Sequence, residues 1–390
     1  MSAVDYDVVV IGGGIHGVGV AQAAAAAGYS ALLLERTALA SGTSSRSSKL
    51  IHGGLRYLEN ARFGLVRESL REREILLRIA PGLVHRVPFH IPVYGNSRRP
   101  PWMIRAGLSL YALLGGLSGH ARFDTLPRAR WDSLDGLDTR GLQAVFCYQD
   151  AQTDDTLLTQ AVMRSAQEFG AELRCPANFL SARRRGDDFV VHILEGKDEH
   201  TCRARTLVNA AGPWVGTVLE RITPRPAVLT VDLVQGAHII VENETRHGIY
   251  YLEAPQDGRG VFIMPWQEHT LIGTTETRFD GDPATVRARP EEIAYLQETL
   301  RRYFPGHRGK LLGSFAGLRV LPHGSGAAFH RSRETILHPD NPDRVRLVTV
   351  YGGKLTGYRA TAVKVMRLLK RSLPPARAPR ADTSEICLSP

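Results

Sequence analysis

The chain opens on a run of apolar residues, 8–11, that is followed at once by glycines. An unbroken run of β-branched residues is typical of a strand buried on both faces of a parallel sheet. An Ala-rich, helix-favouring stretch follows over residues 18–27, and residues 32–34 form a second short apolar run. This order predicts a strand, a helix and a second parallel strand, which is how an α/β fold begins.

Three glycines stand where the first predicted strand meets the helix. Gly12, Gly14 and Gly17 have G-x-G-x-x-G spacing, and Glu35 ends the second strand. In a βαβ unit such glycines allow a tight turn, close approach to a pyrophosphate and packing of helix on strand. The N–H groups at the helix start attract the pyrophosphate, and a carboxylate at Glu35 accepts hydrogen bonds from a ribose. The pattern predicts a dinucleotide site and leaves the dinucleotide open.

Further along the chain the hydrophobic pattern alternates between helical and period-two stretches. Helices are predicted over residues 65–79 and 154–169. Period-two strands between residues 229 and 276 indicate an antiparallel sheet in a separate domain. Residues 347–351 return to a buried strand, and a final helix ends near Leu373. The Pro- and Arg-rich residues 88–105 are predicted to be irregular.

This order predicts a discontinuous nucleotide-binding domain with a second domain inserted into it. The nucleotide-binding domain takes residues 1–80, 145–220 and 335–375, the substrate-binding domain takes residues 81–144 and 221–334, and residues 376–390 form a flexible tail. A length of 390 residues agrees with two domains.

The charge of the chain narrows the class of partner. A net charge of +10 favours anionic partners: phosphate-bearing substrates, an anionic membrane surface or nucleic acid. The sequence has no nucleic-acid motif and its aromatic residues amount to only 7%. We therefore predict no nucleic-acid partner.

The cysteines and the apolar runs bear on metal binding and localisation. The four cysteines, Cys147, Cys175, Cys202 and Cys387, have no C-x-x-C spacing, so we predict neither a metal site nor a disulfide framework. The chain opens without a secretory signal, and no apolar run has the length of a spanning helix, which predicts a cytoplasmic protein. Residues 106–117, flanked by arginines, are either a buried helix or one at the surface of the cytoplasmic membrane.

Several motifs resemble those of the FAD-dependent glycerol-3-phosphate dehydrogenases. The first matching segment is Ile11-Gly12-Gly13-Gly14-Ile15-His16-Gly17. The longest is residues 43–58, Thr-Ser-Ser-Arg-Ser-Ser-Lys-Leu-Ile-His-Gly-Gly-Leu-Arg-Tyr-Leu. The others are residues 101–105, 208–214, 272–276 and 351–359. The resemblance covers about residues 5–372. The sequence departs from the family pattern in lacking the helical C-terminal domain that usually follows the last motif.

The resemblance implies both a fold and a reaction. The fold is α/β: a Rossmann-like, glutathione-reductase-like FAD-binding domain with an inserted antiparallel-sheet substrate domain of the D-amino-acid-oxidase type. The reaction is oxidation of sn-glycerol 3-phosphate at C2 to dihydroxyacetone phosphate, with hydride passing to flavin N5 and electrons to quinone or another acceptor. The alternatives are an amino-acid or amine oxidase of the same fold, and a flavin-binding paralogue acting on a different phosphorylated or hydroxylated substrate.

The resemblance also assigns residues to the substrate. Arg56, Tyr57, Arg319, Arg333 and Lys354 are the expected contacts to the phosphate and hydroxyl groups, and Arg56 and Arg319 are also expected to act in catalysis. His238 is the candidate base, because an imidazole titrates near neutrality. A hydrogen-bonded structural histidine is the alternative interpretation of His238.

A larger set is expected to contact FAD. It comprises Gly12, Gly14, Ile15, Gly17, Glu35, Thr43, Ser44, Ser47, Ser48, Leu50, His52, Gly53, Gly54, Ala211, Gly212, Gly353, Lys354, Leu355 and Thr356. Glycines at 352–353 let the backbone approach the isoalloxazine, and the following helix directs positive potential toward the flavin pyrimidine. That helix is basic and amphipathic over residues 362–371, so it either packs on the nucleotide-binding domain or contacts a membrane surface.

Overall fold

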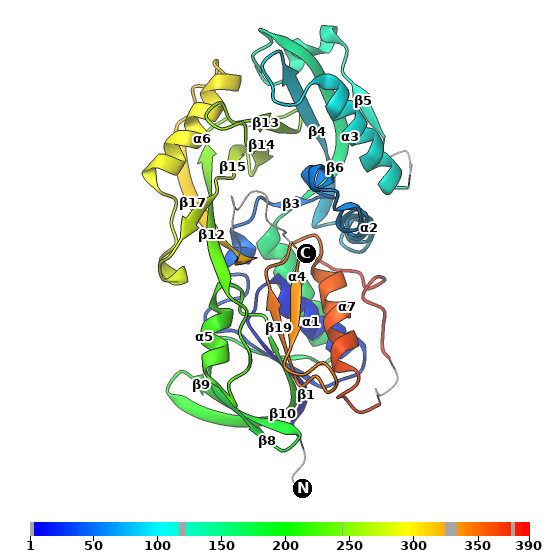
Figure 1. Ribbon diagram of the computed structural model, residues 1–390, viewed down its shortest axis with the longest axis vertical. Coiled ribbons are helices and arrows are strands. Elements are labelled where there is room, and N and C mark those ends of the chain that lie inside the picture. Colours follow the sequence, from blue (N-terminus) through cyan, green and yellow to red (C-terminus); the bar gives the residue numbers. More distant parts are fainter. Residues whose placement is uncertain (1–3, 117–121, 244, 324–333, 376–378) are drawn as a thin grey trace.

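The computed structural model describes residues 4–116, 122–243, 245–323, 334–375 and 379–390. These residues form one sheet of nine strands and another of ten strands. The two sheets lie end to end along the long axis of the molecule, with the nine-stranded sheet at the lower end in Figure 1. The chain crosses between them several times, so both sheets contain segments that are far apart in sequence.

The nine-stranded sheet has a parallel centre. β1 (Tyr6–Ile11) pairs in parallel with β2 (Ala31–Leu34) and with β10 (Asp198–Asn209), which in turn pairs in parallel with β19 (Leu347–Tyr351). The other strands are β7 (Glu172–Arg174), β8 (Asn178–Arg185), β9 (Asp188–Glu195), β11 (Ile222–Thr223) and β18 (Ile336–Pro339). Because parallel strands end at one edge of the sheet, the turns after β1, β10 and β19 meet there.

Helices cover this sheet. α1 (Ile15–Ala26) packs between α4 (Asp155–Glu168) and α7 (Tyr358–Leu369). α1 is buried on nearly all sides, which its alanines permit. Asp154 caps α4 by accepting hydrogen bonds from two backbone N–H groups of the first turn. A short helix, α5 (Val215–Glu220), follows β10.

The ten-stranded sheet is antiparallel except for one pair. β13 and β4 run parallel, whereas every other described pair in this sheet is antiparallel. Its strands are β3 (Leu50–Ile51), β4 (Val84–Tyr94), β5 (Phe123–Thr125), β6 (Leu142–Thr153), β12 (Val231–Val241), β13 (Ile249–Glu253), β14 (Gly260–Trp266), β15 (His269–Gly273), β16 (Thr277–Phe279) and β17 (Leu311–Pro322). The helices beside it are α2 (Phe63–Ile79), α3 (Pro101–Leu114) and α6 (Pro290–Tyr303).

The strands cross the predicted domain boundaries. β6 runs through residue 145, and β3, from the first predicted piece of the nucleotide-binding domain, pairs with it in the ten-stranded sheet. The predicted residue ranges of the two domains stay a prediction.

The prediction of an irregular segment over residues 88–105 is wrong. β4 continues through Pro88 and Pro92, and α3 begins at Pro101. β4 pairs with β6 along its length but with β13 only at Phe89 and His90, so it has a largely open edge, where proline is tolerated. Pro101 starts a helix because the first helical N–H needs no intrahelical partner.

α3 contains most of the apolar run that was predicted to be either buried or at a membrane surface. It buries Ile104, Leu108 and Tyr111 and exposes Trp102 and Leu113. Within the described residues, no helix combines the length and the apolar character needed to cross a bilayer.

The prediction of a flexible tail is wrong for residues 379–390. Ile386 and Leu388 are buried in the core that surrounds α1. The Leu388 N–H donates to Ile79 O at 2.6 Å and the Arg380 N–H donates to Ala26 O at 2.8 Å. The apolar pair and these backbone hydrogen bonds hold residues 379–390 against the core.

Candidate active site

The turn between β1 and α1 is built so that only glycine fits. Gly12 has φ +109°, and a Cβ there would lie 2.7 Å from Ala210 O. A Cβ on Gly17 would overlap Gly12 O, so this glycine sets the close packing of helix on strand. Gly14 is the N-cap of α1 and, with Ile15, faces the loop at Ser44. The turn leaves room for a diphosphate at the helix N-terminus.

Glu35 follows β2 and points back to this turn. Its Oε2 accepts from the Gly13 N–H at 2.7 Å and its Oε1 accepts from the Thr37 N–H at 2.8 Å. These bonds fix the carboxylate on the cavity wall. The Thr37 hydroxyl also donates to Oε1, at 3.1 Å. Since a carboxylate has about four acceptor positions, one remains for a ribose hydroxyl.

Three hydroxyls of the predicted flavin loop make bonds within the protein. Thr43 Oγ1 donates to Leu318 O at 2.8 Å, and Ser44 Oγ accepts from the Ile15 N–H at 2.9 Å. Ser47 Oγ donates to Asp155 Oδ2 at 2.6 Å. They fasten the loop to β17, α1 and α4, while all three residues still line the cavity.

A serine–histidine pair lies deeper in the same cavity. Ser48 Oγ and His238 Nε2 lie 2.9 Å apart in a hydrogen bond, and His238 is 1% exposed. The imidazole stacks on Phe315 with ring centres 4.9 Å apart. Burial, and next the positive charges of Arg319 and Lys49, lower the pKa of His238 to about 3. The imidazole is therefore neutral and able to accept a proton.

Cationic side chains from three segments line this cavity. Arg56 and Tyr57 lie in the 3₁₀ helix η2 (Leu55–Asn60), Arg319 lies on β17, and Lys354 follows β19. Lys354 Nζ lies 3.7 Å from the centre of the Tyr57 ring, and Arg319 Nη2 donates to Thr274 Oγ1 at 3.1 Å. Arg333 lies outside the described residues.

The turn after β19 completes the wall. Gly352 and Gly353 have φ values of +70° and +113°, and a Cβ on Gly353 would overlap the His16 ring. Thr356 Oγ1 accepts from the His52 N–H at 3.1 Å, which ties this turn to the end of β3. Burial lowers the pKa of His16 to about 4, so a neutral ring faces the glycine turn.

The turn after β10 forms the other side of the nucleotide end. Ala211 precedes the 3₁₀ helix η5 (Gly212–Trp214), and its N–H donates to Asn209 Oδ1 at 3.3 Å. Gly212 has φ +55°. Small residues at this turn leave space for a nucleotide next to Gly12.

One cavity of about 470 Å³ brings nearly all the predicted residues together. Its wall includes Gly12, Gly14, Ile15, Glu35, Thr43, Ser44, Ser47, Ser48, Leu50, His52, Gly54, Arg56, Tyr57, Ala211, Gly212, His238, Arg319, Gly353, Lys354, Leu355 and Thr356. Gly17 and Gly53 lie behind the wall. A glycine-only cradle at one end and a cluster of cations with a neutral imidazole at the other fit FAD and an anionic substrate.

Sequence reasoning missed part of this wall. Tyr251, Arg259, Phe262 and Thr274 face the cavity from the ten-stranded sheet. Thr274 lies in the matching segment 272–276. Strand periodicity alone does not show which face of β14 or β15 meets the cavity. Trp214 also lines the cavity, with the Arg36 guanidinium 5.1 Å from its ring centre.

The chain is similar to known proteins along most of its length. Residues 7–359 match the family described as DAO, FAD dependent oxidoreductase. A glycerol-3-phosphate dehydrogenase of Pseudomonas aeruginosa is 40% identical over 375 residues, which cover 94% of this chain and 72% of that protein. A D-erythritol 1-phosphate dehydrogenase of Brucella abortus is 38% identical over 377 residues, covering 94% and 74%.

A solved structure gives the same assignment. The glycerol-3-phosphate dehydrogenase from Bacillus halodurans, complexed with FAD, superposes with a TM-score of 0.73 at 28% identity and covers 100% of this chain and 68% of its own. The predicted fold class and the predicted cofactor, FAD, are confirmed. The chain therefore belongs to the DAO family of FAD-dependent oxidoreductases, with glycerol-3-phosphate dehydrogenases among its relatives.

Proposed function

We propose that this protein oxidises sn-glycerol 3-phosphate to dihydroxyacetone phosphate. The observation that carries the proposal is that Arg56, Arg319 and Lys354 line the same cavity as the buried His238. Relatives at 35–40% identity include several named glycerol-3-phosphate dehydrogenases. FAD, when bound, supplies the acceptor for the hydride that leaves C2.

The cations have the task of holding the phosphate. A phosphate dianion in a cavity needs several charge-assisted hydrogen bonds, and two guanidinium groups and an ammonium group supply them. Tyr57 lies under Lys354 Nζ at 3.7 Å, so its ring helps to fix the ammonium group in place. Binding of the phosphate fixes the position of C2. Positioning of the reacting atom contributes much of the rate of an enzyme of this kind.

His238 Nε2 is the proposed acceptor of the proton from the C2 hydroxyl. Ser48 Oγ, at 2.9 Å from this nitrogen and on the cavity wall, orients the ring. Its hydrogen bond occupies the one lone pair of Nε2, so the C2 hydroxyl proton passes to Ser48 Oγ as the Ser48 proton passes to Nε2. A base with a pKa of about 3 holds a proton poorly, and part of that low value comes from the charge of Arg319. A phosphate dianion beside Arg319 offsets that charge, so substrate binding raises the pKa of His238 toward the range that suits a general base.

A larger polyol phosphate is the second candidate substrate. The D-erythritol 1-phosphate dehydrogenase relative is 38% identical, close to the 40% of the first glycerol-3-phosphate dehydrogenase. Both substrates present a phosphate to cations and a secondary hydroxyl to a base, so the same residues serve either. An amino acid presents a carboxylate and an amine, which require fewer positive groups than this cavity holds.

We propose a quinone as the acceptor that reoxidises the flavin, with a membrane surface as its source. The net charge of +10 favours an anionic surface. α7 contributes little to such a surface, since Ala362, Val365 and Leu369 are buried and Lys364 pairs with Glu68 at 2.6 Å. Reoxidation by a soluble quinone analogue faster than by oxygen supports this acceptor, and the reverse order excludes it.

The substrate is tested by reduction of the bound flavin without oxygen. The purified holoenzyme receives sn-glycerol 3-phosphate, D-erythritol 1-phosphate, glycerol or a mixture of amino acids, and the absorbance of the oxidised flavin is followed. The proposal expects rapid bleaching with glycerol 3-phosphate and little with glycerol. If only the amino acids, or only D-erythritol 1-phosphate, bleach the flavin, glycerol 3-phosphate is not the substrate.

A further inference from the structure

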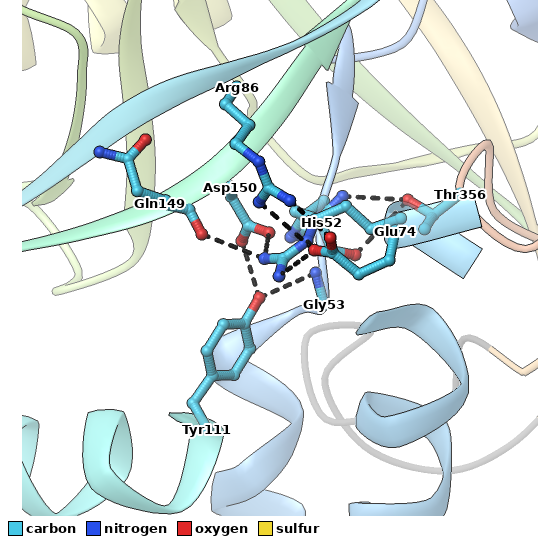
Figure 2. Close-up of polar contacts among 9 residues, drawn as sticks. His52, Gly53, Glu74, Arg86, Tyr111, Gln149, Asp150 and Thr356 are labelled. Carbon is cyan, nitrogen blue, oxygen red and sulfur yellow. Dashed lines mark hydrogen bonds and ion pairs between the residues drawn. The ribbon is translucent and has the colours of Figure 1, made fainter. Parts of the chain in front are cut away.

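A buried polar cluster lies directly behind the wall of the cavity. Tyr111 on α3, Asp150 on β6 and Arg73 on α2 are 3%, 0% and 2% exposed. Arg73 Nη1 donates to Asp150 Oδ1 at 2.6 Å and to Gln149 O at 3.0 Å. Figure 2 shows this cluster meeting the turn at His52 and Gly53. Its three members come from three elements, so it ties those elements to the turn.

The contact with the turn is made by one hydroxyl. Tyr111 Oη accepts from the Gly53 N–H at 2.8 Å and donates to Asp150 Oδ2 at 2.7 Å. A Cβ on Gly53 would overlap Tyr111 Oη and Leu70, so the turn is pressed against α3 and α2. A buried N–H that loses its partner costs about 1–3 kcal/mol, which makes this bond a strong constraint on the turn.

The direction of the hydroxyl is fixed by its surroundings. Burial, followed by the nearby Asp150 charge, raises the pKa of Tyr111 well above its usual value, so the phenol keeps its proton. Asp150 is itself held by Arg73, whose Nε donates to Glu74 Oε1 at 3.0 Å. Arg86 pairs with the other oxygen of Glu74 at 2.5 Å, and Figure 2 shows this outer pair.

The turn is held from its other side as well. The His52 N–H donates to Thr356 Oγ1 at 3.1 Å, on the glycine turn after β19. Two successive N–H groups are thus bound by side chains from opposite sides. The chain then passes through Gly54, with φ +77°, straight into η2, where Arg56 and Tyr57 reach the cavity wall.

We propose that Tyr111, oriented by Asp150, is a positioning residue that sets Arg56 and Tyr57 against the flavin and the substrate phosphate. It acts through the Gly53 N–H and does not itself line the cavity. The expected loss of activity rests on the proposed function. The expected loosening of the turn at His52 and Gly53 does not depend on it.

The test compares two tyrosine variants of the holoenzyme. Tyr111→Phe removes the hydroxyl that binds Gly53. The matched control, Tyr94→Phe, also removes a buried hydroxyl, one that donates to Asp138 O at 2.6 Å on a residue that is 3% exposed and does not line the cavity. Both variants lose a buried hydrogen bond, so both are expected to lower the melting temperature.

Only the first variant is expected to disturb the site. For Tyr111→Phe we expect kcat/KM for glycerol 3-phosphate to fall about 10- to 100-fold, mainly through KM. We also expect faster hydrogen–deuterium exchange in the peptide over residues 52–58. For Tyr94→Phe we expect unchanged kcat/KM and unchanged exchange there. Equal behaviour of the two variants in both measurements overturns the proposal.

Exchange separates this inference from the proposed function, because it needs no substrate. If glycerol 3-phosphate fails to reduce the flavin but residues 52–58 still exchange faster in Tyr111→Phe, the proposed substrate fails and the positioning role stands. If Tyr111→Phe does not fold, hydrogen–deuterium exchange of the Gly53 amide is measured in the unsubstituted holoenzyme instead. A Gly53 amide protected from exchange supports the role, and one that exchanges like an exposed amide overturns it.

Discussion

His238 Nε2 and Ser48 Oγ lie 2.9 Å apart, and this hydrogen bond joins β12 to the loop that precedes β3. The ring has little freedom otherwise, because Phe315 stacks on one face and a Cβ on Gly273 would overlap it on another side. His238 Nδ1 is buried and has no hydrogen-bond partner among the described residues. Ser48 is therefore the polar group that sets which nitrogen faces the cavity.

Removing this hydroxyl is expected to slow the reaction without weakening substrate binding. For Ser48→Ala we expect kcat to fall about tenfold or more, since one orienting hydrogen bond is lost, with little change in KM. The control is Ser45→Ala, whose hydroxyl donates to Gly42 O at 3.3 Å and which does not line the cavity. Steady-state kinetics of the two variants check this. An equal effect of both substitutions argues against an orienting role of Ser48.

The stability of the fold is expected to fall in acid partly because of His238. Burial, Arg319 and Lys49 lower the pKa of His238 to about 3 in the folded state, whereas an unfolded chain has a value of about 6.5. Between these values the unfolded chain binds a proton that the fold does not. The contribution is fully present above the higher value and is lost as the pH falls toward the lower one.

A variant without the imidazole measures this contribution. The stability advantage of the unsubstituted protein over His238→Asn should shrink by up to about 1.4 kcal/mol per pH unit below about pH 6.5. Urea unfolding at several pH values gives the two free energies. The buried carboxyls, whose pKa values are raised by burial at Asp150 and Asp155, are common to both proteins and cancel. An advantage independent of pH contradicts the prediction.

The turn after β19 is expected to tolerate only glycine at one position. Gly353→Ala introduces a Cβ at φ +113° that overlaps the His16 ring, so we expect FAD to dissociate more readily. Gly357→Ala is the matched control, since a Cβ there meets nothing within 4 Å. Flavin fluorescence during titration of the two apoproteins gives the dissociation constants. Similar constants for both variants rule out a role of this turn in holding FAD.

Arg319 is expected to contribute to phosphate binding. Arg319→Gln removes a charge-assisted hydrogen bond, which is worth about 1.5–3 kcal/mol, so KM for glycerol 3-phosphate should rise about 10- to 100-fold. Arg278→Gln, on β16, which pairs with β12 as β17 does, removes a charge from a side chain that is 72% exposed and serves as the control. Glycerol has no phosphate, so loss of phosphate binding in Arg319→Gln should not lower the residual rate of glycerol oxidation. A KM unchanged by Arg319→Gln removes it from the phosphate site.

The features that the sequence predicted best depend on local backbone geometry. Gly12 and Gly353 adopt positive φ values at turns where another residue would collide with a neighbouring segment. β19 spans residues 347–351 as predicted, because its five residues are all buried and form an unbroken apolar run. Patterns of this kind contain their own physical reason and need no knowledge of distant segments.

The features that were missed depend on contacts between distant residues. Thr43 bonds to Leu318 and Ser47 bonds to Asp155, and no local pattern reveals either partner. Tyr111 looked like one apolar position in a hydrophobic helix, yet its hydroxyl meets Gly53. The burial of Ile386 and Leu388 depends on packing against core residues from elsewhere in the chain.

In the proposed reaction, hydride leaves C2 of glycerol 3-phosphate for the flavin in this cavity. Anaerobic stopped-flow reduction of the bound FAD by glycerol 3-phosphate, with hydrogen or with deuterium at C2, tests it most directly. We expect complete bleaching of the flavin, slower with deuterium at C2 than with hydrogen. A flavin that stays oxidised, or one that bleaches at the same rate with either isotope, would contradict it.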